Sequence, residues 1–368
     1  MIFWLLIFFY FFSLFILIYF GRRLSSKKIK ALQNNSFIPS INVNDLTVII
    51  PFRNEEYNLK NLVSSIDNST VLPKEFIFID DHSDDGSLMF LNGISNNLST
   101  IKIFKLDENV KGKKHAIRKG INVTQTAFIL LLDADVLFDS MFFENIGKLK
   151  IHDMIILPVK MYPNKWFQHF FILDVYIANI VNEGIYGLYR PVMASGANFL
   201  IKRDSFLKWD KQNNFGYLGG DDLKILKDFQ NYNGNIGLEI DQKYSVSTAA
   251  PQNLKTYFFQ RLRWIRNARI VKDEFNSILM LLQLGLTASY VCVIFYFLSN
   301  KLYFEALSLL GFKVLLDMFL LFNFFNHRKQ LATWIFIPIY EFLFPIILIV
   351  LTLGSLFVKT NWKGRPLE

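Results

Sequence analysis

The sequence predicts an α/β fold, in which a mostly parallel sheet forms a cytoplasmic domain with transmembrane helices on both sides of it along the chain. Between residues 46 and 252, short apolar runs that end in polar loops alternate with helical patterns. Strands that alternate with helices in this way form βαβ units and parallel sheets. The chain is also 52% hydrophobic with 39 Phe among 368 residues, which is too apolar for an average soluble protein. We therefore expect membrane segments.

The N-terminal segment has the length and composition of a membrane span. Residues 1–20 carry no charge, and about 20 apolar residues suffice to cross a bilayer. A basic start and a small-residue cleavage site are missing, so we expect a transmembrane helix rather than a signal peptide. Residues 21–45 form a basic juxtamembrane linker, which the positive-inside rule places in the cytoplasm.

The net charge indicates which partners to expect, and the cysteine content excludes two kinds of site. The net charge is +9, and many basic residues flank apolar segments, so anionic membrane lipids are the expected partner and no nucleic acid is expected. The one cysteine, Cys292, lies in an apolar segment. A disulfide framework and a cysteine-based metal site are therefore excluded.

The predicted strands each run into a polar cluster. We expect strands at Leu46–Pro51, Phe76–Ile79, Ile101–Leu106 and Ala127–Leu132. In open parallel sheets, ligands bind at the carboxyl ends of the strands. The polar clusters that follow these strands are therefore candidate binding loops.

The stretch Leu130–Phe138 (LLLDADVLF) is the strongest local signal. Asp133 and Asp135 follow a buried strand, and residues at i and i+2 of an extended segment point to the same side. Two carboxylates presented together suit Mg²⁺ or Mn²⁺, which take their remaining ligands from water and substrate phosphates. The alternative is a strand-ending turn, where Asp is common.

Two further loops suggest a nucleotide site. The acidic run Asp80–Asp85 is either a solvated turn or a loop that binds a base or ribose. Lys111–Lys114 opens a helix, where backbone amides and the helix dipole favour phosphate. The chain has neither a GxxxxGK[ST] nor a GxGxxG pattern, which excludes a P-loop and a dinucleotide fingerprint.

The helix expected at residues 253–271 has two different sides. Gln260, Arg263 and Trp264 share one side of it because they lie at i, i+3 and i+4. Apolar residues occupy roughly the opposite side: Leu254, Phe258, Leu262 and Ile265. We interpret it as an interfacial amphipathic helix whose apolar side faces lipid. The alternative is an amphipathic core helix with a solvated basic side.

The C-terminal part, residues 277–358, is expected to contain about three membrane segments, at 277–298, 302–325 and 333–358. Lys313, Asp317 and Glu341 within them either line an acceptor path or pair with one another. Three crossings would put the basic tail, 359–368, outside, which conflicts with its charge, so one segment is expected to be re-entrant.

Residues 167–189 are apolar and aromatic but contain Asp174, Asn182 and Glu183. Such a segment is too polar to cross a membrane. We therefore expect a buried or interfacial helix there.

Seven short motifs in order carry a family resemblance. They are PFRNEE, DDHSDDGS, GKKHAI, LLDADVLF, GANFLIKRDSF, GGDD and QRLRW. From about Leu46 to Trp264 the chain resembles the family 2 glycosyltransferases, inverting enzymes with the Rossmann-like GT-A fold. Membrane segments on both sides are also found in integral members of that family.

The resemblance implies a role for each matched residue. Asp222 matches the general base, beside Asp221, which stands where the family usually has Glu. The alternative use of this acidic pair is to cap the helix that follows. The other implied roles are donor binding by Pro51, Glu55, Asp81, Lys113 and Asp133; metal binding by Asp135 and Asp133; and contact with the acceptor and leaving diphosphate by Gln260, Arg263 and Trp264.

We therefore expect a multi-pass enzyme of the cell membrane, working in the cell envelope, that uses Mg²⁺ or Mn²⁺. It would transfer a sugar from a nucleotide-diphosphate donor to a lipid, lipid-linked or glycan acceptor. One alternative is a processive polysaccharide synthase. Alternatives of another class are a non-catalytic membrane scaffold that keeps the GT-A fold and a nucleotidyltransferase with a similar sheet.

Overall fold

The structure is a computed structural model that describes residues 2–95, 100–209, 221–271, 273–358, 361–362 and 365–366. It divides into two compact units, each considered by itself below. The membrane-helix unit consists of Met1–Lys28, Pro163–Val192 and Ala250–Val358, and the sheet unit of Ile29–Tyr162, Met193–Ala249 and Lys359–Glu368. The glycines of the GGDD motif and the tail residues Lys359 and Lys363 lie outside the described residues.

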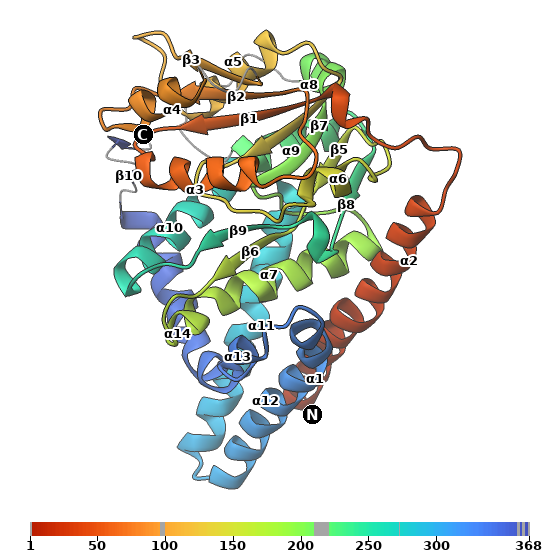
Figure 1. The fold of residues 1–368 in the computed structure, drawn as a ribbon. Coiled ribbons are helices and arrows are strands. Elements are labelled where there is room, and N and C mark those ends of the chain that lie inside the picture. The colour runs from red at the N-terminus through yellow and green to blue at the C-terminus, as the bar shows by residue number, and fades with distance from the viewer. Residues whose placement is uncertain are drawn as a thin grey trace. The chain divides into compact units, whose positions relative to one another are not determined.

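The sheet unit is built on a seven-stranded sheet (Figure 1) with the strand order β3-β2-β1-β4-β7-β5-β8. The strands are β1 (Leu46–Phe52), β2 (Glu75–Asp80), β3 (Ile101–Lys105), β4 (Phe128–Leu132), β5 (Met154–Ile156), β7 (Asn198–Lys202) and β8 (Ile236–Leu238). The four strands expected from the sequence are confirmed as β1 to β4, and they pair in parallel. The sheet is mostly parallel, with β7 antiparallel to both β4 and β5.

The strands at the centre of this sheet are fully buried because helices cover its faces. Every residue of β1 and β4 is buried, as expected for parallel strands whose two faces are both covered. Helix α3 (Glu56–Asp67) buries Leu59, Leu62, Val63 and Ile66, which recur at helical spacing. The core is therefore continuous from β1 to its covering helices.

The remaining elements of the sheet unit are shorter. The helices are η2 (Val43–Asp45), α4 (Ser87–Ser95), α5 (Lys113–Val123), α6 (Phe142–Ile146), α8 (Arg203–Trp209), α9 (Asp221–Asn231) and η3 (Gln242–Tyr244). A second, two-stranded parallel sheet pairs β6 (Val159–Tyr162) with β9 (Val246–Ala249). A third pairs β10 (Asn361–Trp362) with β11 (Arg365–Pro366).

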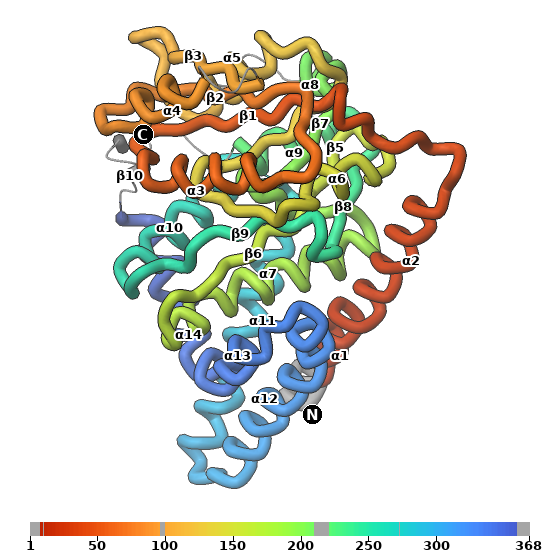
Figure 2. The backbone as a smooth tube through the Cα atoms, viewed as in Figure 1, coloured from red at the N-terminus to blue at the C-terminus, as the bar shows by residue number. Residues whose placement is uncertain are grey.

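The chain enters through a continuous helical stretch (Figure 2), composed of α1 (Ile2–Phe15), the π-helix η1 (Ile16–Gly21) and α2 (Arg22–Gln33). Residues 22–33, which we expected in a basic linker, are therefore helical. This segment consists largely of Arg, Lys, Leu, Ala and Gln, which are good helix formers. The unit boundary falls within α2.

The membrane-helix unit also contains α7 (Gln168–Leu188), α10 (Leu254–Val271), α11 (Glu274–Ser299), α12 (Tyr303–His327), α13 (Leu331–Trp334) and α14 (Ile337–Phe357). Three of them, α11, α12 and α14, are long and apolar enough to cross a membrane. They correspond to the three C-terminal segments expected from the sequence. The segment 167–189 is a helix, as predicted, and Phe171, Tyr176 and Ile180 are among its buried residues.

Helix α7 packs against η1 through glycines. A Cβ atom at Gly187 would overlap the carbonyl oxygen of Gly21, and one at Gly184 would overlap that of Leu17. Glycine is required here because the two backbones approach too closely for any side chain. Beside this crossing, the buried Glu183 accepts hydrogen bonds from Arg22 (3.1 Å) and from Arg328.

The charged residues of the C-terminal helices pair with one another. Lys313 donates to Asp317 one turn along α12 (2.6 Å) and to Glu341 on α14. Lys313 and Asp317 are both buried. Of the two roles expected from the sequence, the structure shows pairing across helices.

Candidate active site

The loops after β1 and β2 are joined to each other. Asn54 donates to the carboxylate of Asp84 (2.6 Å), and its own side-chain oxygen accepts the backbone N–H of Asp84 (2.9 Å). The backbone N–H of Glu55 donates to Ser87 Oγ (2.8 Å). Asn54 and His82 both have left-handed backbones, with φ of 53° and 58°. Such strain is held only where the surroundings enforce it, and it is common at functional sites.

Asp81 accepts a hydrogen bond from the loop that precedes α5. It is 1% exposed, and its Oδ2 accepts the backbone N–H of Gly112 (3.0 Å) while Oδ1 contacts His82 Nδ1 (3.2 Å). Burial raises the pKa of Asp81, and the hydrogen bonds from Gly112 and His82 oppose that rise. Pro51 lies beside this edge as a buried residue of β1, paired with Ile79 of β2.

Lys113, the first residue of α5, connects to the DxD sequence. Its ammonium forms an ion pair with Asp133 and donates to the carbonyl oxygen of Gly196 (3.4 Å). Burial alone would lower the pKa of Lys113, but the charges of Asp133, Asp222 and Asp221 outweigh burial and raise it. Lys113 is therefore a cation surrounded by carboxylates.

Gly196 connects this cluster to Asp222, because its backbone N–H donates to Asp222 Oδ2 (2.8 Å). Strand β7 begins two residues later and runs antiparallel to β4, with Asn198 paired to Leu132. That register brings the residues before β7 beside the residues after β4. A Cβ atom at position 196 would lie 2.9 Å from Lys113 Nζ, so a side chain there would displace the end of the lysine.

Asp222 also accepts the backbone N–H of Leu223 on Oδ1 (2.8 Å). Each of its oxygens thus accepts one backbone hydrogen bond, and a carboxylate oxygen can accept two. Helix α9 begins at Asp221, so both aspartates lie in its first turn. That either of them caps the helix stays a prediction.

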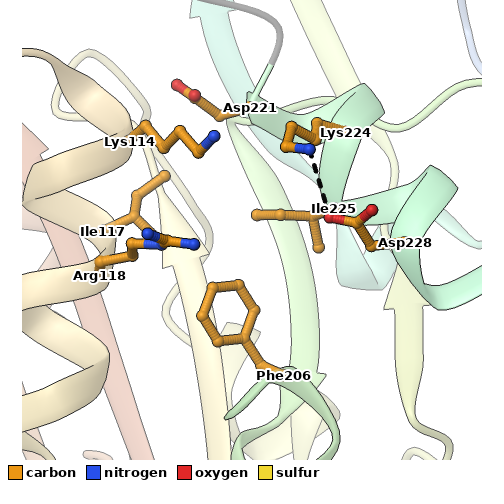
Figure 3. Close-up of a pocket in the computed structure, with 8 residues that line it drawn as sticks. All are labelled: Lys114, Ile117, Arg118, Phe206, Asp221, Lys224, Ile225 and Asp228. Atoms are coloured by element: carbon orange, nitrogen blue, oxygen red, sulfur yellow. Dashed lines mark ion pairs between the residues drawn. The ribbon is translucent and has the colours of Figure 1, made fainter. Parts of the chain in front are cut away.

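Asp221 differs from Asp222 in its burial and in its hydrogen bonds. It is 8% exposed, and among the described residues its Oδ1 has no hydrogen-bond partner. Burial raises the pKa of Asp221 to about 6, with Lys113 opposing and Asp222 adding to the rise. Figure 3 shows Asp221 at one end of a small pocket, with Lys114 of α5 and Lys224 of α9 on either side and Phe206 at the other end.

Asp135 is an exposed residue with other carboxylates near it. Thr248 of β9 donates to its Oδ2 (3.2 Å). Desolvation by the surrounding protein, together with the charges of Asp133 and Glu55, raises the pKa of Asp135 to about 6. A bound cation would relieve this accumulation of negative charge.

The donor set fits an ion that takes few ligands from protein. Within the described ranges, no group of three or more His, Cys, Asp and Glu residues is arranged to hold a metal by itself. Mg²⁺ is commonly held by one or two carboxylates together with water and substrate phosphates. Asp135, with Asp133 beside it, meets that requirement.

The remaining predicted residues, Gln260, Arg263 and Trp264, lie on α10 in the membrane-helix unit. One expectation about this helix was wrong. Leu262, expected to face lipid, is 6% exposed and is the side chain that a Cβ atom at Gly354 of α14 would meet, 2.9 Å away. Arg261 is also buried, at 4% exposed, and pairs with Asp174 of α7. Leu254 and Phe259 of the same helix are exposed.

Gly196, Thr248 and Asn54 contact the predicted site residues or join their loops, and the sequence did not single them out. Gly196 stands in the GANF motif, so a signal was present, although its contacts with Lys113 and Asp222 depend on the β4–β7 register. Thr248 stands in a short strand without a motif, 113 residues after Asp135. No local pattern links those two residues.

Residues 47–207 match the family model described as Glycosyl transferase family 2. The chain carries a family 2 glycosyltransferase domain. This domain includes Asp81, Lys113, Asp133 and Asp135, whereas the acidic pair and the QRLRW helix follow it. The resemblance inferred from the seven motifs is thereby confirmed.

A curated relative of this chain is the cholesterol galactosyltransferase of Borreliella burgdorferi. It is 34% identical over 90 residues, which are 24% of this chain and 25% of the relative. The matched part thus spans a quarter of the relative's length.

Among solved structures, the mannosyltransferase PcManGT from Pyrobaculum calidifontis, in complex with GDP-Man and Mn²⁺, is similar with a TM-score of 0.60. The match covers 95% of this chain and 98% of that protein at 14% identity. S. aureus TarS matches with a TM-score of 0.41 at 16% identity over 62% of this chain and 40% of its own, which is too low to show a shared fold. The family 2 domain has the GT-A fold, as predicted.

Proposed function

We propose that the protein is a membrane-bound, metal-dependent, inverting glycosyltransferase that moves a sugar from a nucleotide-diphosphate donor to a lipid or lipid-linked acceptor. The observation that carries this proposal is the cluster of Lys113, Asp133, Gly196 and Asp222 at the end of β4, with Asp135 next to it. It combines a cation, a candidate metal ligand and a candidate base, which are the groups that sugar transfer from a diphosphate requires.

The donor would bind along the carboxyl edge of the sheet. Pro51, Glu55 and Asp81 would surround the nucleotide, and Lys113 would face the diphosphate, whose negative charge grows as it leaves. Asp135, assisted by Asp133, would hold Mg²⁺ or Mn²⁺, which supplies further charge stabilisation to the leaving diphosphate. The Mn²⁺ in the PcManGT complex supports a divalent ion for this fold.

The chemistry needs one base and no covalent intermediate. An acceptor hydroxyl attacks the anomeric carbon, the bond from that carbon to the diphosphate oxygen breaks, and the hydroxyl proton passes to Asp222. The configuration is inverted because a single displacement occurs. The backbone N–H groups of Gly196 and Leu223 hold the carboxylate of Asp222 in place.

A lipid acceptor agrees with the rest of the chain. Helices α11, α12 and α14 are apolar and long enough to cross a bilayer, and the Borreliella burgdorferi relative is named for a lipid acceptor, cholesterol. We propose that residues 1–20 also cross, that residues 253–271 lie in the cytoplasmic membrane interface, and that Gln260, Arg263 and Trp264 act at the acceptor side. The enzyme would then be a multi-pass protein of the cell membrane with a cytoplasmic active site.

A transfer assay tests this function. Purified protein in vesicles would be incubated with Mn²⁺, lipid extracts and a panel of radiolabelled nucleotide-diphosphate sugars. We expect label to enter the organic phase, with release of the nucleoside diphosphate. Label in a water-soluble polymer would favour a processive synthase, release of pyrophosphate would favour a nucleotidyltransferase, and no transfer from any donor would favour a scaffold.

The Asp222→Asn variant tests in the same assay whether Asp222 is the general base. Because a general base contributes about 10²-fold or more, the variant should lose at least that factor in turnover and keep its affinity for the nucleoside diphosphate. A variant with full turnover would exclude Asp222 as the base. A variant that loses donor affinity instead would show that Asp222 binds the donor or caps α9.

A further inference from the structure

Arg261, the second residue of the QRLRW sequence, is a buried cation, and each of its three guanidinium nitrogens donates a hydrogen bond. Its Nε and Nη2 donate to the two carboxylate oxygens of Asp174 on α7, each at 2.7 Å. Nη2 also donates to the backbone carbonyl of Phe171 (2.6 Å). This is a bidentate arginine–carboxylate pair, which restricts orientation as well as distance. A lysine could not reproduce it because its ammonium lacks the planar fork.

Asp174 is itself held. The hydroxyl of Tyr257, a side chain with no exposed surface, donates to Asp174 Oδ2 (3.1 Å). Burial and the Asp174 charge raise the pKa of Tyr257, so its hydroxyl keeps its proton and remains a donor. The guanidinium of Arg261 lies 4.7 Å from the centre of the Tyr257 ring. The three side chains therefore hold one another in a single arrangement.

Two residues of the QRLRW sequence depend directly on this arrangement. Nη1 of Arg261 donates to the side-chain oxygen of Gln260. An arginine has only donors, so Gln260 must turn its oxygen toward Arg261 and present its NH₂ group elsewhere. The same guanidinium lies 4.5 Å from the ring centre of Trp264, within cation–π range. Trp264 is 37% exposed, so a ring held from one side remains open to a ligand.

We propose that Arg261, clamped by Asp174, is a positioning residue for sugar transfer: it orients the Gln260 amide and the Trp264 ring for contact with the acceptor. This inference rests on the proposed function, because that function gives Gln260 and Trp264 a substrate to contact. Arg261 itself touches no substrate. A displacement of about 1 Å in a positioning group can cost on the order of 10²-fold in rate.

The competing explanation is that the pair only fastens α7 to α10. Helix α7 offers a matched control, since Glu183 is buried on the same helix and its ion pairs are with Arg22 of α2 and with Arg328 at the end of α12. Glu183→Gln and Asp174→Asn each neutralise one carboxylate of α7 that pairs with arginine. Only Asp174→Asn acts on Gln260 and Trp264.

The kinetic experiment compares Arg261→Lys, Asp174→Asn and Glu183→Gln in the vesicle assay. We expect the first two to lower turnover or raise the acceptor KM by about 10- to 100-fold, with the donor KM unchanged. Glu183→Gln should lower only the melting temperature. In a Gln260→Ala background, Arg261→Lys should cause a smaller additional loss than in the wild type, because the groups act as a unit. Equal kinetic effects of Asp174→Asn and Glu183→Gln would overturn the proposal.

A spectroscopic experiment tests the placement without activity. The contribution of Trp264 to fluorescence is obtained as the difference between each protein and its Trp264→Phe counterpart. We expect acrylamide to quench this contribution more strongly in Asp174→Asn and Arg261→Lys than in wild type or Glu183→Gln. Unchanged quenching would overturn the positioning role. If no donor supports transfer but quenching changes as expected, the proposed function is wrong, while the conclusion that Arg261 and Asp174 position Trp264 is kept.

Discussion

At the scale of single residues, the four aspartates near the end of β4 and the start of α9 differ in what surrounds them. Asp133 is paired with Lys113, and Asp222 accepts two backbone N–H groups. Asp135 accepts one hydroxyl, from Thr248, and Asp221 is buried with an oxygen that lacks a partner among the described residues. In the sequence these four aspartates look alike. Their surroundings differ because Asp133 contacts Lys113, Asp222 contacts Gly196 and Asp135 contacts Thr248.

Asp221 should reduce stability at neutral pH. Its pKa is about 6 in the folded protein, raised from 3.8, so the folded state binds the proton more tightly than the unfolded state does. Ionisation of Asp221 therefore lowers the free energy of unfolding. This loss is absent below pH 3.8, grows between pH 3.8 and 6, and is complete above pH 6. Asp221→Asn should stabilise the protein at pH 7.5, by up to about 3 kcal/mol for a shift of this size.

Thermal unfolding at pH 4 and pH 7.5, followed by tryptophan fluorescence, measures this effect. The melting temperature of Asp221→Asn should exceed that of the wild type at pH 7.5, and the difference should nearly vanish at pH 4. An Asp221→Asn variant that is destabilised equally at both pH values would contradict the burial of a charged Asp221.

At the scale of the elements, α7 shows what the sequence could and could not predict. Its helical form was predicted and is confirmed. The partners of its acidic residues could not be predicted, because Asp174 binds an arginine 87 residues later and Glu183 binds one 145 residues later. For the same reason the burial of Arg261 was not predicted. A buried cation and an exposed one look alike in a sequence until the carboxylate that pairs with the cation is known.

The crossing of α7 and η1 should tolerate no side chain at its closest point. A methyl group at position 187 would overlap the backbone of Gly21, so Gly187→Ala must separate the two helices and should destabilise the protein strongly. Gly285 in α11 is a matched control, because a Cβ atom there would meet nothing within 4 Å. Gly285→Ala should be neutral, or stabilising by up to about 1 kcal/mol.

Melting temperature and yield of folded protein, measured for both variants in the same detergent, test this crossing. A Gly187→Ala protein as stable as Gly285→Ala would mean that α7 and η1 are not in backbone contact. A large loss confined to Gly187→Ala would support the glycine crossing.

At the scale of the whole molecule, the sequence predicted the parallel core and the site at its carboxyl edge, because β1 to β4 each run directly into polar residues. It did not predict that β7 enters the sheet antiparallel beside β4. An apolar run such as Asn198–Lys202 has the same pattern in either direction. That one pairing brings Gly196 to Lys113 and to Asp222, so the part of the site that depends on strand order could be found only in the structure.

The central claim is that the edge of this sheet binds a nucleotide-diphosphate sugar with a divalent ion at Asp135 and transfers the sugar. The most direct measurement is the rate of sugar transfer by the wild type and by Asp135→Ala, each with Mn²⁺ and with excess EDTA. We expect transfer only by the wild type with Mn²⁺, with activity restored when Mn²⁺ is returned after EDTA. Full transfer in excess EDTA, or by Asp135→Ala, would contradict the claim.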